Sequence, residues 1–331
     1  MNLLNVRVGT RASKLALTQT QQTADRLAAV GGFDVELVHV RTDGDVLTGP
    51  LSQMGGTGVF VTALRDSLLA GRCDVAVHSL KDLPTSVAPG LTMAAIPPRA
   101  DVRDALCARD GLKLADLPAG SRVGTGSPRR AAQLRSARAD LDVVDIRGNV
   151  DTRLGRVPGL TGNPESLDGQ NRVEGKFADL DAVVLAAAGL SRIGRLDVVS
   201  EYLDTALMLP APGQGALAVE CRSEDAAGPL GLALAALDDA DTRLAVTAER
   251  ALLARLEAGC AAPVGTLAFR KGSMLQLEAV VCAVDGTRAI RLKKATDGLT
   301  EIGATLLGIE VAEGLLAQGA ADLADLAASG S

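Results

Sequence analysis

The segment GTGSPRR at residues 124–130 is typical of a helix start that binds an anion. Ser127 suits the N-cap, and Pro128 suits the first helical position, where its missing N–H costs nothing. Free N–H groups at such a helix start attract anions, and the guanidinium groups of Arg129 and Arg130 favour carboxylate. The alternative is a capped surface helix with two solvated arginines. No third glycine follows the Gly-x-Gly, which argues against a dinucleotide-binding site.

Arginines also follow three other predicted strands. Each one alone is more simply a surface residue, but open α/β sheets bind ligands at the carboxyl ends of their strands. Four strand ends that each carry arginine therefore predict a site for a small, carboxylate-rich molecule. The residues are Arg11 and Ser13 after the strand at 6–9, Arg147, Asn149 and Arg153 after the strand at 143–146, and Arg192 after the strand at 183–186.

A group of ionisable residues, HSLKD at 78–82, follows the strand predicted at 74–77. A lone Lys–Asp pair is usually a surface ion pair that contributes little. At the same sheet edge as the arginines, the pair of Lys81 and Asp82 favours a functional role. A carboxylate among cations stays ionised, so we expect Asp82 to stabilise a developing cation rather than to act as a strong acid. Two histidines in the whole chain are too few for a histidine-based metal site.

The five cysteines contain no CxxC pair, which argues against a zinc cluster or a disulfide framework. Cys73, Cys107, Cys221 and Cys282 lie in or beside apolar strand patterns, so we expect buried thiols. Cys260 instead follows a helix-ending glycine and precedes an Ala-Ala-Pro turn. It is either an exposed, positioned thiol that serves as a nucleophile or attachment point, or an incidental loop cysteine.

The composition excludes several classes of protein. A net charge of −6 provides no attraction to nucleic acid or to anionic membranes, and 2% aromatic residues leave few rings on which to stack bases. Seven of the 34 basic residues are lysine, which leaves 27 arginines; high-GC codon usage accounts for part of that excess. Neither a signal-peptide pattern nor a membrane-spanning apolar run is seen, so we expect a cytoplasmic protein.

The order of elements predicts two α/β units and a third, smaller unit. Strands at 6–9, 35–40 and 74–77 alternate with helices at 13–30 and 59–70, which indicates a parallel sheet covered by helices. A second α/β unit begins near residue 105. From about residue 241 a long helix, alternating strands and a C-terminal helix indicate a small α+β unit.

Several segments of the chain resemble the hydroxymethylbilane synthase family, also called porphobilinogen deaminase. They occur in the order found in that family, and HSLKDLP, GSPRR, RGNV and the cysteine loop are together highly specific. The matching segments are GTRASKLAL (9–17), VFVTAL (59–64), DVAVHSLKDLP (74–84), GTGSPRR (124–130), IRGNVDTRL (146–154), AAAGLSR (186–192), LPAPGQGALAVECR (209–222) and AERALLARLEAGCAAPVG (248–265).

The resemblance implies an α/β fold of three domains. The first two would be similar to type II periplasmic binding proteins, with an active-site cleft between them, and the third would be a smaller α+β domain that carries Cys260. We expect domain 1 at residues 1–97 with 216–237, domain 2 at 98–215 and domain 3 at 238–331. A monomer is implied.

The resemblance also implies a reaction. Four porphobilinogens join head to tail with loss of ammonia, and hydrolysis frees the linear tetrapyrrole hydroxymethylbilane for heme biosynthesis. A dipyrromethane cofactor would be held by a thioether to Cys260, and Asp82 would stabilise the azafulvene cation formed when ammonia leaves. No metal is needed. The residues implied for binding cofactor and substrate are Arg11, Ser13, Ser79, Lys81, Thr125, Ser127, Arg129, Arg130, Arg147, Asn149, Arg153 and Arg192.

Two features depart from the family pattern. Many members carry lysine at the position of Thr57, so one contact to cofactor or substrate is in doubt here. The stretch 158–175 is longer than the usual connection, and we expect it at the surface. The glycine-rich stretch 42–58 is predicted to be a mobile loop.

Two other functions are compatible with parts of the sequence. A non-catalytic binding protein of the same two-lobed architecture would sense a small carboxylate, but it would have no use for Cys260 or Asp82. A nucleic-acid binder is suggested by the arginines, yet the acidic net charge and the scarcity of aromatic residues oppose it.

Overall fold

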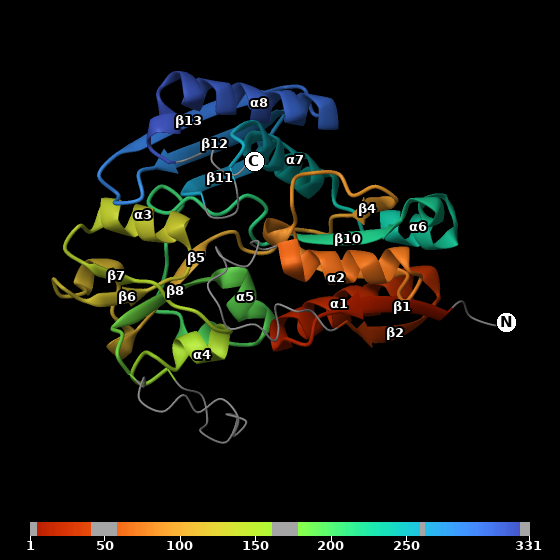
Figure 1. Cartoon of the computed structure of the whole chain (residues 1–331), viewed down its shortest axis with the longest axis horizontal. Coiled ribbons are helices and arrows are strands. Elements are labelled where there is room, and N and C mark those ends of the chain that lie inside the picture. The colour runs from red at the N-terminus through yellow and green to blue at the C-terminus, as the bar shows by residue number, and fades with distance from the viewer. Residues whose placement is uncertain (1–4, 41–57, 161–177, 259–261, 325–331) are drawn as a thin grey trace.

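A computed structural model describes residues 5–40, 58–160, 178–258 and 262–324, which form three sheets with their covering helices (Figure 1). The predicted class, two α/β units and a smaller unit with its own sheet, is confirmed. No described helix is long and apolar enough to cross a membrane.

The first sheet has the strand order β2-β1-β3-β10-β4. Its first three strands are parallel, as predicted, and β10 runs antiparallel to both β3 and β4. The predicted strand at 74–77 extends further, so His78 and Ser79 lie within β3. The elements are β1 (Asn5–Thr10), α1 (Lys14–Gly31), β2 (Asp34–His39), α2 (Gly58–Leu69), β3 (Val75–Ser79), β4 (Leu91–Ala95), β10 (Leu217–Arg222) and α6 (Pro229–Ala235).

The second sheet has the order β7-β6-β8-β5-β9. Strand β6 is parallel to β7 and β8, whereas β5 is antiparallel to β8 and β9. Its inner strands are buried on both faces, which suits their apolar sequences. The elements are β5 (Asp104–Ala108), β6 (Arg122–Gly124), α3 (Pro128–Ala137), β7 (Asp142–Val144), α4 (Val150–Leu154), β8 (Ala182–Ala186), α5 (Ala187–Arg192) and β9 (Glu201–Tyr202).

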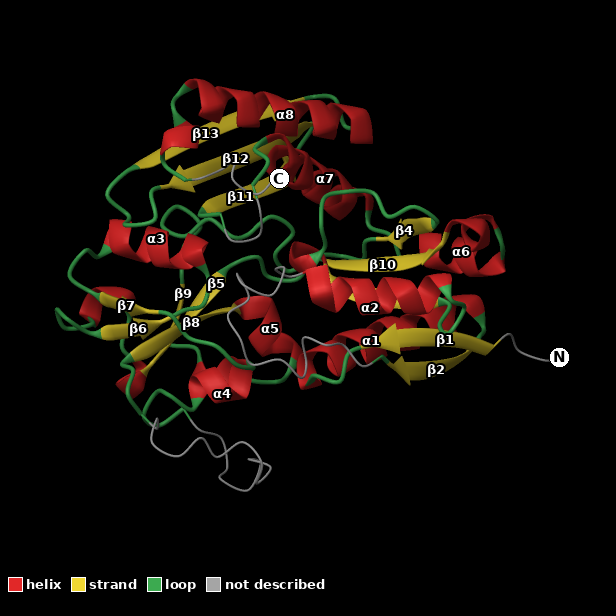
Figure 2. Cartoon of the chain, in the orientation of Figure 1, coloured by secondary structure: helices red, strands yellow, loops and turns green. Residues whose placement is uncertain are grey.

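The third sheet is an antiparallel meander of β11, β12 and β13, and α7 and α8 pack on it in one shared apolar core. Figure 2 shows the two helices beside each other. They lie very close, because a Cβ at Gly308 would meet the Ala248 carbonyl oxygen at 2.3 Å. Strand β11 was not predicted. The elements are α7 (Ala240–Arg255), β11 (Val264–Lys271), β12 (Met274–Cys282), β13 (Ala289–Thr296) and α8 (Glu301–Ala317).

The chain passes between the first two sheets twice, through residues 96–103 and 203–216. The two crossovers contact each other, since the Ala100 N–H donates to the Gly215 carbonyl at 3.2 Å. Gly215 has a φ of 86°, and a Cβ there would lie 2.8 Å from the Ala100 carbonyl oxygen. Only glycine fits both demands. The domain limits given above remain a prediction.

Candidate active site

Asp82 lies in a single 3₁₀ turn, Leu80–Asp82, that directly follows β3. The Leu83 N–H donates to the Leu80 carbonyl at 3.1 Å, and the Leu80 N–H donates to the carbonyl of Ala216 in the second crossover at 3.1 Å. The side chains of Leu80 and Leu83 are buried, whereas Asp82 is half-buried. The turn is therefore anchored by its leucines and leaves the carboxylate within reach of a ligand.

Lys81 connects this turn to the second α/β unit. Burial lowers the pKa of Lys81 below its usual value; the charge of Asp82 opposes this shift, while the charges of Arg130 and Arg129 add to it. The two arginines are in α3, so Lys81 lies close enough to the second unit for the charges of Arg129 and Arg130 to act on it. Within the described ranges, no hydrogen bond or ion pair engages the Asp82 carboxylate.

The helix start at 124–130 forms as predicted, with Ser127 as the N-cap of α3 and Pro128 at its first position. The alternative of solvated arginines is wrong, because Arg129 and Arg130 are only 3% and 5% exposed. Both guanidinium groups bind Asp104: Nη2 of Arg129 lies 2.8 Å from its Oδ2, and Nη2 of Arg130 lies 2.7 Å from its Oδ1. Sequence reasoning missed Asp104, which is the fully buried first residue of β5.

Asp104 carries its charge in a buried setting. Burial is the largest influence on its pKa and would raise it, but the charges and hydrogen bonds of Arg129 and Arg130 together lower that pKa to about 2. Gln214 of the second crossover donates a further hydrogen bond to the same carboxylate at 2.9 Å. Asp104 thus holds the two arginines and one crossover in a single network.

Replacing Asp104 with asparagine is expected to destabilise the fold by about 3–5 kcal/mol, because two buried guanidinium groups lose their counter-charge. Urea unfolding at neutral pH measures the loss. The carboxylate contributes stability above its unfolded pKa of about 4, and that contribution disappears as the pH falls toward 2. The difference between wild type and Asp104→Asn should therefore shrink between about pH 4 and pH 2.

The control for this variant is Asp101→Asn. Asp101 lies three residues before Asp104, and its loss removes a partly exposed ion pair with Arg103. Such pairs contribute about 0–1 kcal/mol. Equal losses in the two variants, or a difference that does not change with pH, would contradict the role given to Asp104.

Three further predicted arginines surround this cluster. Arg153 is half-buried, and burial, followed by the charges of Arg130 and Arg147, lowers its pKa to about 10. Arg147 is exposed and lies 3.4 Å from Asp145. Burial lowers the pKa of Arg192, whose Nη2 donates to the Gly215 carbonyl at 2.7 Å. The mutual repulsion of Arg153, Arg130 and Arg147 favours a ligand with several carboxylates at this place.

The smaller polar residues have structural partners. Ser13 caps α1 by accepting from the Ala16 N–H at 3.3 Å, and Asn149 caps α4 by accepting from the Thr152 N–H at 2.8 Å. Thr125 accepts from the Ser127 N–H at 3.2 Å, and Ser79 lies 3.4 Å from the amide of Gln19. These contacts order the backbone at the strand ends. Arg11 follows β1 directly.

The predicted burial of four thiols is confirmed. Cys73, Cys107, Cys221 and Cys282 are buried, and burial raises the pKa of Cys107 to about 12 and those of Cys221 and Cys282 to about 11. Cys260 lies outside the described residues, on the connection from α7 to β11. So do Thr57, all but the last residue of the stretch 42–58, and most of the stretch 158–175.

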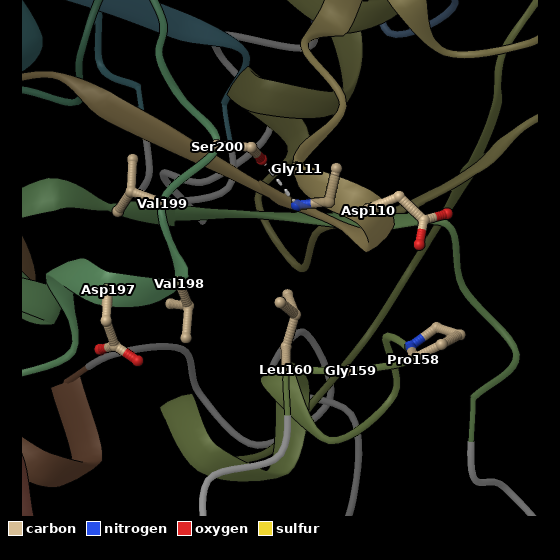
Figure 3. A pocket seen from close by; sticks show the side chains of 10 residues that line it. Asp110, Gly111, Pro158, Gly159, Leu160, Asp197, Val198, Val199 and Ser200 are labelled. Atoms are coloured by element: carbon tan, nitrogen blue, oxygen red, sulfur yellow. Dashed lines mark hydrogen bonds between the residues drawn. The ribbon is translucent and has the colours of Figure 1, made fainter.

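A pocket of about 350 Å³ lies elsewhere, on the second α/β unit (Figure 3). Three segments line it, with Asp110, Leu160 and Asp197 among them. Its charged residues are both acidic, and none of the predicted site residues lines it. Anionic ligands are therefore expected at the arginine cluster rather than in this pocket.

Family models match most of the chain. Residues 6–228 match the model described as "Porphobilinogen deaminase, dipyromethane cofactor binding domain", and residues 243–317 match "Porphobilinogen deaminase, C-terminal domain". The porphobilinogen deaminase of Cutibacterium acnes is 55% identical over 338 residues, which cover 98% of each chain. That of Thermobifida fusca is 52% identical and covers 100% of this chain and 99% of its own.

Two solved structures that resemble this chain are distant relatives of its fold. A TRAP periplasmic solute-binding protein from Desulfovibrio salexigens has a TM-score of 0.38 and 12% identity, covering 71% of this chain and 72% of its own. One from Ochrobactrum anthropi has a TM-score of 0.36 and 11% identity, covering 71% and 73%. Values this low carry no inference about function. The family models and the close, full-length relatives show that the chain belongs to the porphobilinogen deaminase family.

Proposed function

We propose that this chain is a hydroxymethylbilane synthase, which joins four porphobilinogens head to tail, releases one ammonia for each, and hydrolyses the finished chain from the enzyme. The observation that carries the proposal is the convergence of Lys81 and Asp82 with Arg129, Arg130 and Arg153 at the junction of two α/β units. Each porphobilinogen brings an acetate and a propionate, so the growing product needs many cationic partners.

The cations divide by their present partners. Arg129 and Arg130 are bound to Asp104, so we assign them to the inner wall of the site, where they set its potential. Arg147, Arg153 and Lys81 are assigned direct contact with substrate carboxylates. Arg11 and Arg192, together with Ser13, Ser79, Thr125, Ser127 and Asn149, would complete the binding surface.

Asp82 is the proposed catalytic residue. When ammonia leaves porphobilinogen, the C–N bond breaks and the remaining pyrrole carries a positive charge shared with its ring nitrogen. The carboxylate of Asp82 would face that nitrogen and stabilise the charge as it develops. Its half-buried position beside Lys81 suits this role, because a partly desolvated carboxylate interacts more strongly than one in water.

The described residues fit a dipyrromethane cofactor, since a cluster of mutually repelling cations favours a ligand that carries several carboxylates. We propose that Cys260 anchors it: the thiol and two porphobilinogens give a thioether and two molecules of ammonia. When bound, the cofactor supplies the free pyrrole carbon at which chain growth begins. The burial of the four other thiols supports Cys260 as the anchor. A cytoplasmic monomer with the domain limits given above completes the proposal.

The experiment is turnover of porphobilinogen by the purified protein, with release of ammonia and formation of a linear tetrapyrrole followed together. Four ammonia molecules for each tetrapyrrole would support the proposal. Tight binding of porphobilinogen without ammonia release would favour the non-catalytic binding protein.

A further inference from the structure

An arginine of the third unit donates hydrogen bonds to the backbone just after the turn that carries Asp82. Arg250 of α7 donates from Nη1 to the Leu83 carbonyl at 3.0 Å and from Nη2 to the Pro84 carbonyl at 2.6 Å. These carbonyls belong to the two residues that directly follow Asp82. Leu83 has extended backbone angles, as a residue before proline should, and the two hydrogen bonds from Arg250 hold its carbonyl and that of Pro84.

Apolar packing supports the same contact. Val246 lies one turn before Arg250 on α7 and is fully buried in a cluster with Leu80 and Leu83. Residues four apart lie on the same face of a helix, so one face of α7 supplies both the apolar contact and the fork of donors. Figure 1 shows α7 on the side of the third unit that faces β10 and β4.

The helix itself is fixed to the crossovers by the neighbouring residue. The fully buried carboxylate of Glu249 accepts two hydrogen bonds from Arg99, at 2.7 and 3.0 Å, and one from the Gly213 N–H at 2.7 Å. It also accepts from the Ala268 N–H of β11 at 2.8 Å. Arg250 therefore binds the backbone beside Asp82 from α7, a helix that Glu249 connects to both crossover segments.

We infer that Arg250 is a positioning residue that sets the place of the Asp82 carboxylate, an inference that rests on the proposed function. The planar guanidinium can satisfy two adjacent carbonyls at once, which the single ammonium of lysine cannot do in the same geometry. Small displacements of a reacting group cost much of its effect. The third unit thus helps to set the catalytic carboxylate as well as carrying the cysteine loop.

The test compares Arg250→Leu with wild type in porphobilinogen turnover, with rates expressed per cofactor-loaded molecule from intact mass. We expect kcat to fall about 10- to 100-fold with KM nearly unchanged, since the carboxylate is misplaced but the arginines that bind substrate remain. Arg250→Lys should lie between the two. If Arg250→Leu does not fold, the comparison of Arg250→Lys with wild type provides the test.

Arg243→Leu is the matched control. Arg243 is also on α7; it binds Asp238 at 2.7 Å and reaches the first unit at the Met93 carbonyl at 3.4 Å rather than at Leu83 or Pro84. It should lose stability to urea but keep kcat. A double variant separates positioning from general damage, because Arg250→Leu should cost nothing further once Asp82 is alanine.

Normal kcat in Arg250→Leu, or full additivity in the double variant, would overturn the inference while leaving the proposed function intact. An inactive wild type would overturn both.

Discussion

Replacing Asp82 with alanine is expected to leave a folded, cofactor-loaded protein whose kcat is lower by about 100- to 1,000-fold, the usual cost of removing one group that stabilises charge in a transition state. The carboxylate is half-buried in a turn whose buried contacts are made by Leu80 and Leu83, so the fold does not depend on it. Steady-state ammonia release gives kcat, and urea unfolding shows that the protein is intact.

Asp110→Ala is the control, because Asp110 is an equally charged residue with 73% of its side chain exposed, and it lines the pocket away from the arginine cluster. It should be fully active. The Asp82 variant distinguishes electrostatic from structural roles through KM, which should change little if only the transition state has lost a partner. Near-normal kcat would remove Asp82 from the mechanism.

Replacing Cys260 with alanine is expected to abolish turnover altogether and to remove a covalent mass. Intact mass spectrometry of the denatured wild type should show an excess equal to two porphobilinogens less two ammonia molecules. The variant should show the mass of the chain alone, even after incubation with porphobilinogen, because no other thiol is both exposed and easily ionised among the described cysteines.

Cys282→Ala is the matched control, since Cys282 is buried at the end of β12 and burial raises its pKa to about 11. It should keep both the added mass and the activity. An added mass that survives in Cys260→Ala would move the anchor to another residue, whereas an unmodified wild type would favour the binding-protein alternative.

Sequence patterns predicted most of the elements that position the site. The N-caps Ser127 and Ser13 lie where the pattern placed them, because capping depends on neighbours within one turn. The strands before Arg11 and Lys81 were found for the same reason, since alternation and apolar runs are local properties.

The partners of those residues could not be predicted. Asp104 opens an apolar strand, and nothing nearby in the sequence indicates that arginines 25 and 26 positions later bind it. Arg250 is 167 and 166 positions from the two residues whose carbonyls accept its hydrogen bonds. Such contacts depend on how elements distant in the sequence pack against one another, within a unit for Asp104 and between units for Arg250, and periodicity does not encode that packing. The one local signal was the charged Asp104 in an otherwise apolar strand, because a buried carboxylate requires a counter-charge.

The pairing of Arg129 and Arg130 with Asp104 has a consequence for how the protein matures. Gathering cations in one place before any ligand arrives would oppose folding through their mutual repulsion. Asp104 is part of the chain, so its carboxylate offsets part of the charge of Arg129 and Arg130 as soon as the second sheet forms. The chain can therefore complete the fold of its second sheet before any carboxylate ligand binds near these arginines.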